Sequence, residues 1–255
     1  MINLIKTTYG ALLDAGKTPS GLTYELRPDT VENGLKVAEA KDDKPWRQKA
    51  MQVLAVTESV GGVNVRQNGG VDFIAGLPDV DVAFLALAWT ADVNGRDMKL
   101  ASSVPCPHCN APFNSIDLGG LGVMVRDEPG TGPAAIISID MPDDIRIGLP
   151  PSLKDGRFKL KDPTWRDSRI RVPLSCADDM MVIDQYRVMS ALMVSHDDNP
   201  PRAVLASESL KFRMRVIQFL IKEADRVLPN FTRELQIKCN ACGGEIDVPF
   251  DRAGA

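Results

Sequence analysis

The chain has 255 residues, 44% of them hydrophobic and 25% charged, which is enough for one large packed domain or two smaller ones. Its net charge of −4 and its pI near 5.3 argue against a protein that mainly binds nucleic acid, for which a basic surface is expected. With only two histidines, His108 and His196, and no nucleotide-binding or hydrolase motif, the composition also argues against an enzyme.

The N-terminal residues lack the basic segment, apolar core and cleavage site of a secretory signal. The longest apolar run, residues 82–89, is too short to span a bilayer. Four of the five cysteines form two Cys-x-x-Cys pairs, which leaves only Cys176. This number and spacing do not suit a fold held together by disulfide bonds. We therefore expect an intracellular, reducing location and no membrane association.

The first hundred residues predict a strand followed by a helical lobe. A turn and a strand are expected over residues 19–27, and a short helix capped by Asp29 or Thr30 should run to Ala40. Pro45 should begin an amphipathic helix that includes Glu58 and is ended by the following glycine pair.

A strand-like segment should then lead to a helix over residues 82–92. This helix is apolar nearly all round, so it should be buried. It delivers the chain to the first cysteine pair, Cys106 and Cys109.

The middle of the chain predicts loops and strands. Gly119, Gly120 and Gly122, together with the Pro/Gly-rich run 128–133, indicate flexible connections, and residues 134–149 alternate like a pair of strands. Residues 154–171 carry seven basic and three acidic side chains. Basic and apolar residues alternate in two stretches of this region, 157–161 and 169–172. Such alternation is typical of strands with one solvated face, and a partner-binding patch is the alternative.

Two helices are predicted in the last third. The first begins near Asp178 and includes Leu192 and Met193. The second begins at Ser207, counts Leu210 among its core positions and ends before Pro229, from which the chain runs to the second pair, Cys239 and Cys242. Each pair thus follows a buried helix and a short strand, an internal symmetry that suggests two helix packets flanking one ribbon.

The two pairs together offer four thiolates, a complete ligand set for one tetrahedral zinc ion. Zinc-ribbon pairs usually lie about 15 to 20 residues apart, whereas residues 110–238 separate these two. The sequence therefore predicts a split ribbon in which Cys106, Cys109, Cys239 and Cys242 hold a structural Zn²⁺ that joins distant segments. His108 could replace a thiolate, but with four cysteines present it is not expected to be a ligand.

Two alternatives to a structural site stay open. Cys-Pro-His-Cys is also the active-site tetrad of oxidising thioredoxin-fold enzymes, although Pro112 and the glycines after it favour a turn and a strand over the helix that such enzymes need. A zinc-ribbon adaptor for nucleic acid would use the basic stretch 154–171.

Other chemistry-bearing residues have structural interpretations. The adjacent carboxylates at 143–144, 178–179 and 197–198 point in different directions and suit helix capping or solvation better than metal binding. Cys176 is expected to be a small buried side chain, since no histidine lies near it in sequence, and His196 should lie in a loop.

Several ordered features resemble the T4-type baseplate hub assembly proteins of tailed phages and related contractile systems. They span most of the chain and are the Pro-Ser-Gly turn with Leu26 and Arg27, the Gly-Leu-Pro-Asp-Val-Asp run from Gly76, the first pair with Val104 and Pro105, Arg171-Val172-Pro173, and Leu228-Pro229 before Ile237 and the second pair. Asn110 stands where a glycine usually follows the first pair, a mild departure because asparagine tolerates a left-handed backbone.

The resemblance implies a non-catalytic protein that docks onto other baseplate, hub or tail-tube proteins, with no small-molecule substrate. Its location would be the host cytoplasm during assembly and, if it is retained, the tail baseplate of the virion. The predicted fold is α+β, with helical lobes and short antiparallel strands around the four-cysteine site. We expect an N-terminal lobe (1–100), a first knuckle (101–118), a β-rich insert (119–175), a C-terminal helical lobe (176–230) and a second knuckle with a tail (231–255).

Overall fold

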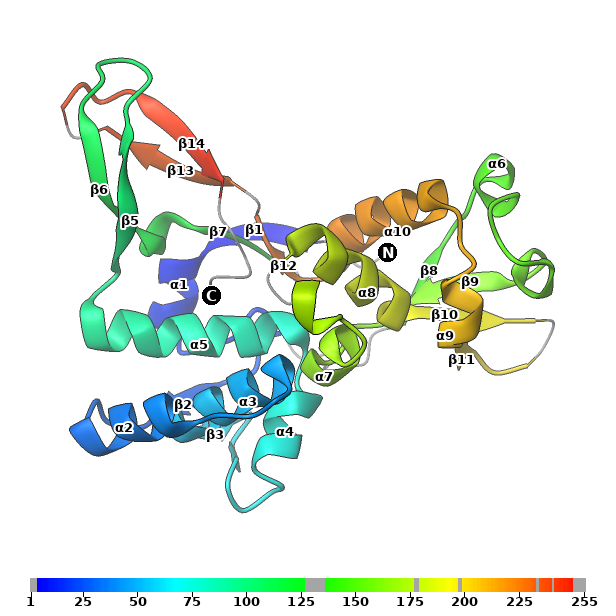
Figure 1. Ribbon diagram of the computed structural model, residues 1–255, viewed down its shortest axis with the longest axis horizontal. Coiled ribbons are helices and arrows are strands. Elements are labelled where there is room, and N and C mark those ends of the chain that lie inside the picture. The colour runs from blue at the N-terminus through cyan, green and yellow to red at the C-terminus, as the bar shows by residue number, and fades with distance from the viewer. Residues whose placement is uncertain are drawn as a thin grey trace.

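The computed structural model describes residues 4–126, 136–176, 179–196, 199–232, 234–239 and 241–249, and it has the predicted α+β fold (Figure 1). Within these residues none of the helices has both the length and the hydrophobicity needed to cross a bilayer. The predicted division into lobes and knuckles stays a prediction, and the run 128–133 and the pair 197–198 fall outside the described residues.

The described strands pair antiparallel in five small sheets. The sheets are β1 (Leu4–Thr8), β7 (Gly122–Arg126) and β12 (Asn230–Phe231); β2 (Tyr24–Leu26), β3 (Thr57–Val60) and β4 (Val63–Asn64); β11 (Arg202–Ala203), β10 (Leu192–Ser195), β9 (Arg157–Leu160) and β8 (Ile137–Ile139); β5 (Asp97–Pro105) and β6 (Pro112–Asp117); and β13 (Glu234–Lys238) and β14 (Glu245–Pro249).

Ten α-helices lie in the described ranges. They are α1 (Tyr9–Ala15), α2 (Val31–Glu39), α3 (Pro45–Val56), α4 (Val71–Gly76), α5 (Asp79–Asn94), α6 (Asp143–Arg146), α7 (Trp165–Arg169), α8 (Met180–Ala191), α9 (Ala206–Ser209) and α10 (Met214–Val227), with short 3-10 turns at Leu118–Gly120, Pro151–Leu153 and Leu174–Cys176.

Helix α5 is the axis around which the N-terminal half is packed. It was predicted to be buried, and Phe84 and Leu85 on its two sides are both fully buried. Phe84 belongs to a core that also contains Tyr9, Val123 and Phe231, whereas Leu85 belongs to a separate core beneath α3 and α4. A third core lies between α8, α10 and the four-stranded sheet.

The sheet β1-β7-β12 and the core around Phe84 lie where the two cysteine-bearing segments leave the body of the protein. Helix α5 leads into β5, and β12 leads into β13, so both cysteine-bearing hairpins start from this region. Figure 1 shows the β5–β6 and β13–β14 hairpins standing away from the body side by side. As predicted, each cysteine pair follows a helix and a strand, α5 and β5 for the first pair and α10 and β13 for the second, although α10 is buried along one face only.

Local capping signals placed several helices correctly. Thr30 caps α2 by accepting a hydrogen bond from the Asn33 N–H (3.2 Å), and Pro45 begins α3. Asp179 caps α8 through the N–H groups of Met181 and Val182, as the capping interpretation of the adjacent carboxylates predicted. Residue 178 lies outside the described residues.

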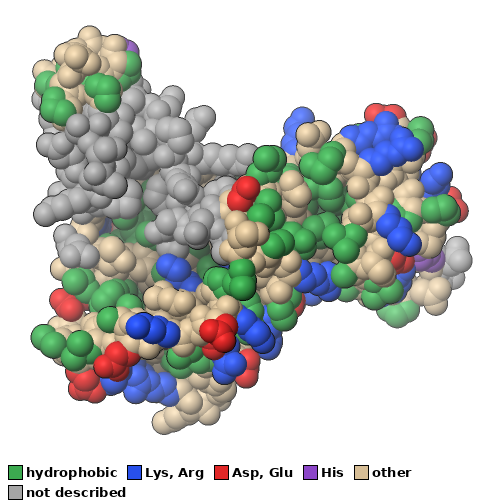
Figure 2. All heavy atoms as spheres, viewed as in Figure 1, with side chains coloured by type: hydrophobic (Ala, Val, Ile, Leu, Met, Phe, Trp, Pro, Cys, Tyr) green, Lys and Arg blue, Asp and Glu red, His purple; other side chains and the backbone are tan. Residues whose placement is uncertain are grey.

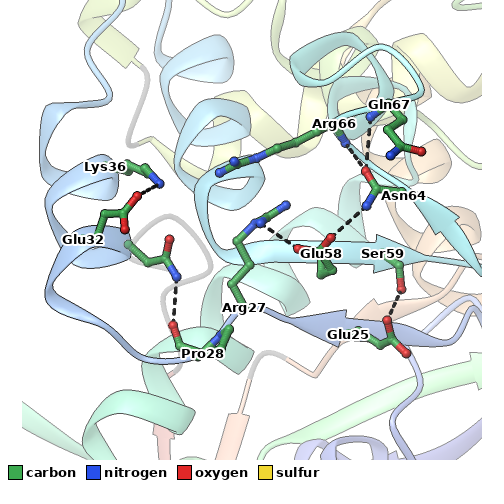
Figure 3. A network of polar contacts seen from close by, with 11 residues as sticks. Glu25, Arg27, Pro28, Glu32, Lys36, Glu58, Ser59, Asn64, Arg66 and Gln67 are labelled. Atoms are coloured by element: carbon green, nitrogen blue, oxygen red, sulfur yellow. Dashed lines mark hydrogen bonds and ion pairs between the residues drawn. The ribbon is translucent and has the colours of Figure 1, made fainter.

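The predicted helix through Glu58 was wrong at its end, because the helix stops at Val56 and β3 follows. Gly61 and Gly62, both with positive φ, form the two-residue turn of the β3–β4 hairpin instead of ending a helix. Glu58 forms an ion pair with Arg27 (2.6 Å) and accepts a hydrogen bond from the Asn64 side chain (2.8 Å), as Figure 3 shows.

The glycines after the first knuckle were also misread. Gly122 is not part of a flexible connection but the first residue of β7, the central strand of its sheet. Of residues 134–149, only Ile137–Ile139 form a described strand, and Asp143–Arg146 form a helix. The strand-like segment expected before Gly76 contains helix α4.

Two helices in the last third were predicted too long. Leu192 and Met193 belong to β10, because this segment pairs with β9 in the register Leu192 to Leu160. The helix expected from Ser207 is broken into α9 and α10, since the Arg213 N–H bonds to the Gly148 carbonyl and leaves the helical pattern. Leu210, predicted to be a core residue, is 69% exposed at this break.

A buried carboxyl lies at the start of α5. Asp81 is fully buried, and its Oδ1 accepts a hydrogen bond from the Ser20 N–H (3.0 Å). Nearby, Asp162 and Asp79 are each paired with a buried arginine, whereas Asp81 forms no ion pair within the described residues. Burial raises the pKa of Asp81 to about 7, against the lowering effect of hydrogen bonds from Ser20 and Thr18.

This pKa predicts a pH-dependent stability. The pKa of Asp81 in the folded protein lies above its ordinary value of 3.8. The contribution of the protonated Asp81 carboxyl to the free energy of unfolding is therefore fully present below about pH 4, and it is lost as the pH rises through about 7. Between these limits, Asp81→Asn should remove a slope of up to about 1.4 kcal/mol per pH unit. The measurement is the difference in free energy of unfolding between the two proteins at saturating zinc and several pH values; parallel profiles would contradict it.

Candidate metal centre

The first cysteine pair lies in a tight turn at the tip of the β5–β6 hairpin. The Cys106 N–H bonds to the Ala111 carbonyl (2.8 Å), and the Asn110 N–H bonds back to the Cys106 carbonyl (2.8 Å). Asn110 has a φ of 62°, the left-handed conformation that the sequence led us to expect it to tolerate. The His108 N–H points at the Cys106 sulfur (3.4 Å), as in a zinc knuckle.

The second pair repeats this turn between β13 and β14. The Cys239 N–H bonds to the Gly244 carbonyl (2.9 Å), and the Gly243 N–H bonds to the Cys239 carbonyl (2.7 Å). Gly243 has a φ of 71° and so occupies the position that Asn110 holds in the first turn. The two knuckles are therefore built by the same backbone pattern from unrelated parts of the chain.

The four sulfurs converge on one point. The distance between Sγ atoms is 3.8 Å for Cys106 and Cys242 and 3.6 Å for Cys109 and Cys239, and all four lie within 4.8 Å of one another. A regular tetrahedron with zinc–sulfur bonds of about 2.3 Å has sulfur–sulfur edges of about 3.8 Å. The predicted ligand residues are thus brought together at the spacing that a zinc ion requires.

The same distances argue against disulfides, because bonded sulfurs lie about 2.05 Å apart and all four cysteines are free thiols. Cys106 also follows a strand and precedes a turn and β6. The helix that stabilises the attacking thiolate of a thioredoxin-fold enzyme is not found there, so the geometry favours metal binding over dithiol chemistry.

Burial and ionisation differ between the cysteines of each pair. Cys106 and Cys239 are buried, whereas Cys109 and Cys242 are exposed at the tip. A backbone hydrogen bond from Cys242 lowers the pKa of Cys239, which favours its thiolate form. For Cys109, a backbone hydrogen bond from Ala111 lowers the pKa, but the closeness of the three other thiols outweighs it and raises the pKa. Four thiolates this close together repel one another. A divalent cation bound between them would offset that repulsion, because thiolates are its ligands.

His108 contacts the opposite knuckle without joining the sulfur cluster. A Cβ atom at Gly244 would lie 2.5 Å from its Cδ2 atom, so the ring packs on the backbone where only glycine leaves room. The cluster consists of the four cysteines alone. Sequence reasoning missed Gly244 as a site residue, although a glycine pair directly after the second Cys-x-x-Cys was the available signal.

The remaining candidates do not form a second centre. The described residues contain no other group of three or more Cys, His, Asp or Glu side chains able to hold a metal. Cys176 is half-buried beside Ser175, so the prediction of a buried side chain was wrong, and His196 lies in a loop as expected.

The basic stretch 154–171 does not form one continuous strand surface, because it is divided between a strand and a helix. Residues 157–160 form β9 with Phe158 buried, as predicted, but Trp165–Arg169 is a helix, so the second expected strand was wrong. Arg166 pairs with Asp72 (3.3 Å), and Arg169 stacks on the Trp165 ring (3.7 Å to its centroid).

Comparison of the chain with protein-family models, with curated proteins and with solved structures finds no match.

Proposed function

We propose that the chain is a non-enzymatic structural or assembly protein in which one zinc ion locks two distant hairpins together. The observation that carries the proposal is the closed cluster of Cys106, Cys109, Cys239 and Cys242. A zinc ion held by four protein ligands has no open position for a substrate or an activated water, so such a site stabilises structure and does not catalyse.

The place of the ion in the fold supports the same role. The two hairpins that hold the four cysteines extend from the region of one small sheet, β1-β7-β12, and of the core around Phe84. Zinc at their tips closes a loop of more than a hundred residues, which contains the whole C-terminal half of the body. The ion therefore fixes the position of the projecting ribbon relative to the helices that carry it.

We further propose that this scaffold acts in the baseplate hub of a phage or a phage-like contractile system. The support is the resemblance of its ordered sequence features to the T4-type hub assembly proteins. Its partners would be other baseplate, hub or tail-tube proteins, met in the host cytoplasm during assembly.

The test is co-expression of the zinc-loaded chain with the hub and tail-tube proteins of the same particle, followed by cross-linking and mass spectrometry. We expect cross-links from the chain to at least one of these proteins, and we expect them to disappear for Cys239→Ser. The Cys176→Ser protein, which keeps the four ligands, is the matched control. A particle that assembles normally with the Cys239→Ser chain would overturn the proposal.

A further inference from the structure

Residues 210–215, which link α9 to α10 and include the first two residues of α10, form a surface feature that the metal site does not explain. Its sequence is Leu-Lys-Phe-Arg-Met-Arg, and no Asp or Glu occurs between Glu208 and Glu223. In a chain whose net charge is −4, the connector is therefore a local reversal of charge. We call residues 210–215 the basic connector.

Polar and apolar side chains of the basic connector are exposed together. Leu210 is 69% exposed and Met214 is 53% exposed, and Lys211, Arg213 and Arg215 are exposed between and beside them. Exposed apolar side chains rimmed by polar ones are a feature of protein interaction sites.

The connector is held in a fixed shape by the body of the protein. Phe212 packs against the core beneath α8 and α10, and its N–H bonds to the Ser209 carbonyl (3.1 Å). The Arg213 N–H bonds to the Gly148 carbonyl (3.1 Å), which sets Ile147, 59% exposed, beside the connector. A surface that is ordered before binding loses little entropy when a partner docks.

The cations of the connector have no partner within the described part of the chain. Lys211, Arg213 and Arg215 form no ion pair there, and the nearest acid in sequence, Glu208, is already paired with Arg202 (2.9 Å). Figure 2 shows Lys and Arg side chains next to hydrophobic and acidic ones at the end of the molecule that carries α6. The surface therefore offers three exposed cations that form no ion pair within the described residues.

We propose that the basic connector and Ile147 form a docking surface for an acidic amphipathic segment of a partner protein. Carboxylates of that segment would meet Lys211, Arg213 and Arg215, and its apolar side chains would cover Leu210 and Met214. Arginine and methionine are enriched in protein interfaces, whereas single-stranded nucleic acid is bound by exposed aromatic rings, and Phe212 packs against the core. The proposal rests on the assembly role, for which it names the kind of partner.

The test uses the zinc-loaded full chain and a fluorescent synthetic helix with Glu along one face and Leu along the other. Three proteins are compared: wild type, K211E/R213E/R215E, and K41E/R66E/R171E, which makes the same charge change at exposed positions away from the connector and Ile147. Single-stranded DNA and vesicles of anionic lipid serve as competing probes, and zinc content is measured in every sample.

We expect the acidic helix to bind the wild type and the K41E/R66E/R171E control equally, and to bind K211E/R213E/R215E about tenfold more weakly or worse. L210S/M214S should also weaken binding of the acidic helix. This loss should persist at high salt, because salt screens the charged contacts but not the apolar ones. No binding of the helix, equal binding by all variants, or a preference for DNA or vesicles at the connector would overturn the proposal. Loss of zinc from the wild type would instead count against the proposed scaffold role.

Discussion

Cys239→Ser is expected to lose the bound zinc although Cys106, Cys109 and Cys242 remain. Cys239 is the buried ligand whose pKa is lowered by a backbone hydrogen bond from Cys242, and its sulfur lies 3.6 Å from that of Cys109. A structural zinc site contributes on the order of 10 kcal/mol where folding and metal binding are coupled. We therefore expect a fall of several kcal/mol in the free energy of unfolding, together with a loss of solubility.

The measurement is metal content by mass spectrometry and unfolding by denaturant, with zinc present throughout. Cys176→Ser removes a half-buried thiol outside the cluster and should leave both quantities unchanged. A Cys239→Ser protein that keeps one zinc ion and wild-type stability would show that the two knuckles do not share a site.

Arg187→Met is expected to destabilise the protein by about 3–5 kcal/mol, because it leaves a buried carboxylate without its partner. Arg187 on α8 donates from Nε to Asp79 at the start of α5 (2.8 Å) and from Nη2 to the Pro229 carbonyl (3.1 Å). Both charged side chains are buried. The pair therefore ties together the two helices and the segment that leads to β12.

The double variant D79N/R187M separates the pair from its packing. Removing both charges should restore part of the stability that Arg187→Met loses, since the unpaired carboxylate is then absent. The measurement is denaturant unfolding of the zinc-loaded proteins. A loss below about 1 kcal/mol for the single variant, or no recovery in the double variant, would show that the pair does not stabilise the fold.

Where the decisive signal is local, the sequence predicted the structure well. The cap at Thr30, the helix start at Pro45 and the apolar helix before the first knuckle all depend on neighbouring residues. The turn at each cysteine pair is also local, and Asn110 adopts the left-handed backbone that its side chain tolerates. The four-cysteine cluster could be predicted because a tetrahedral zinc site needs four thiolates, and the chain offers them in two pairs.

Non-local pairing explains the errors. Gly61 and Gly62 suit a helix end and a hairpin turn equally, and the pairing of β3 with β2 decides between them. Leu192 fits a helix by its spacing but pairs with β9. The buried partners of Arg187 lie far away in sequence, so no pattern of neighbouring residues could announce them.

The most direct test of the account is the metal content of the chain purified under reducing conditions, with free thiols titrated before and after denaturation in a chelator. One zinc ion per chain, with the thiols of Cys106, Cys109, Cys239 and Cys242 reacting only after chelation, is the predicted result. A chain without metal that forms a reversible disulfide between Cys106 and Cys109 would contradict it.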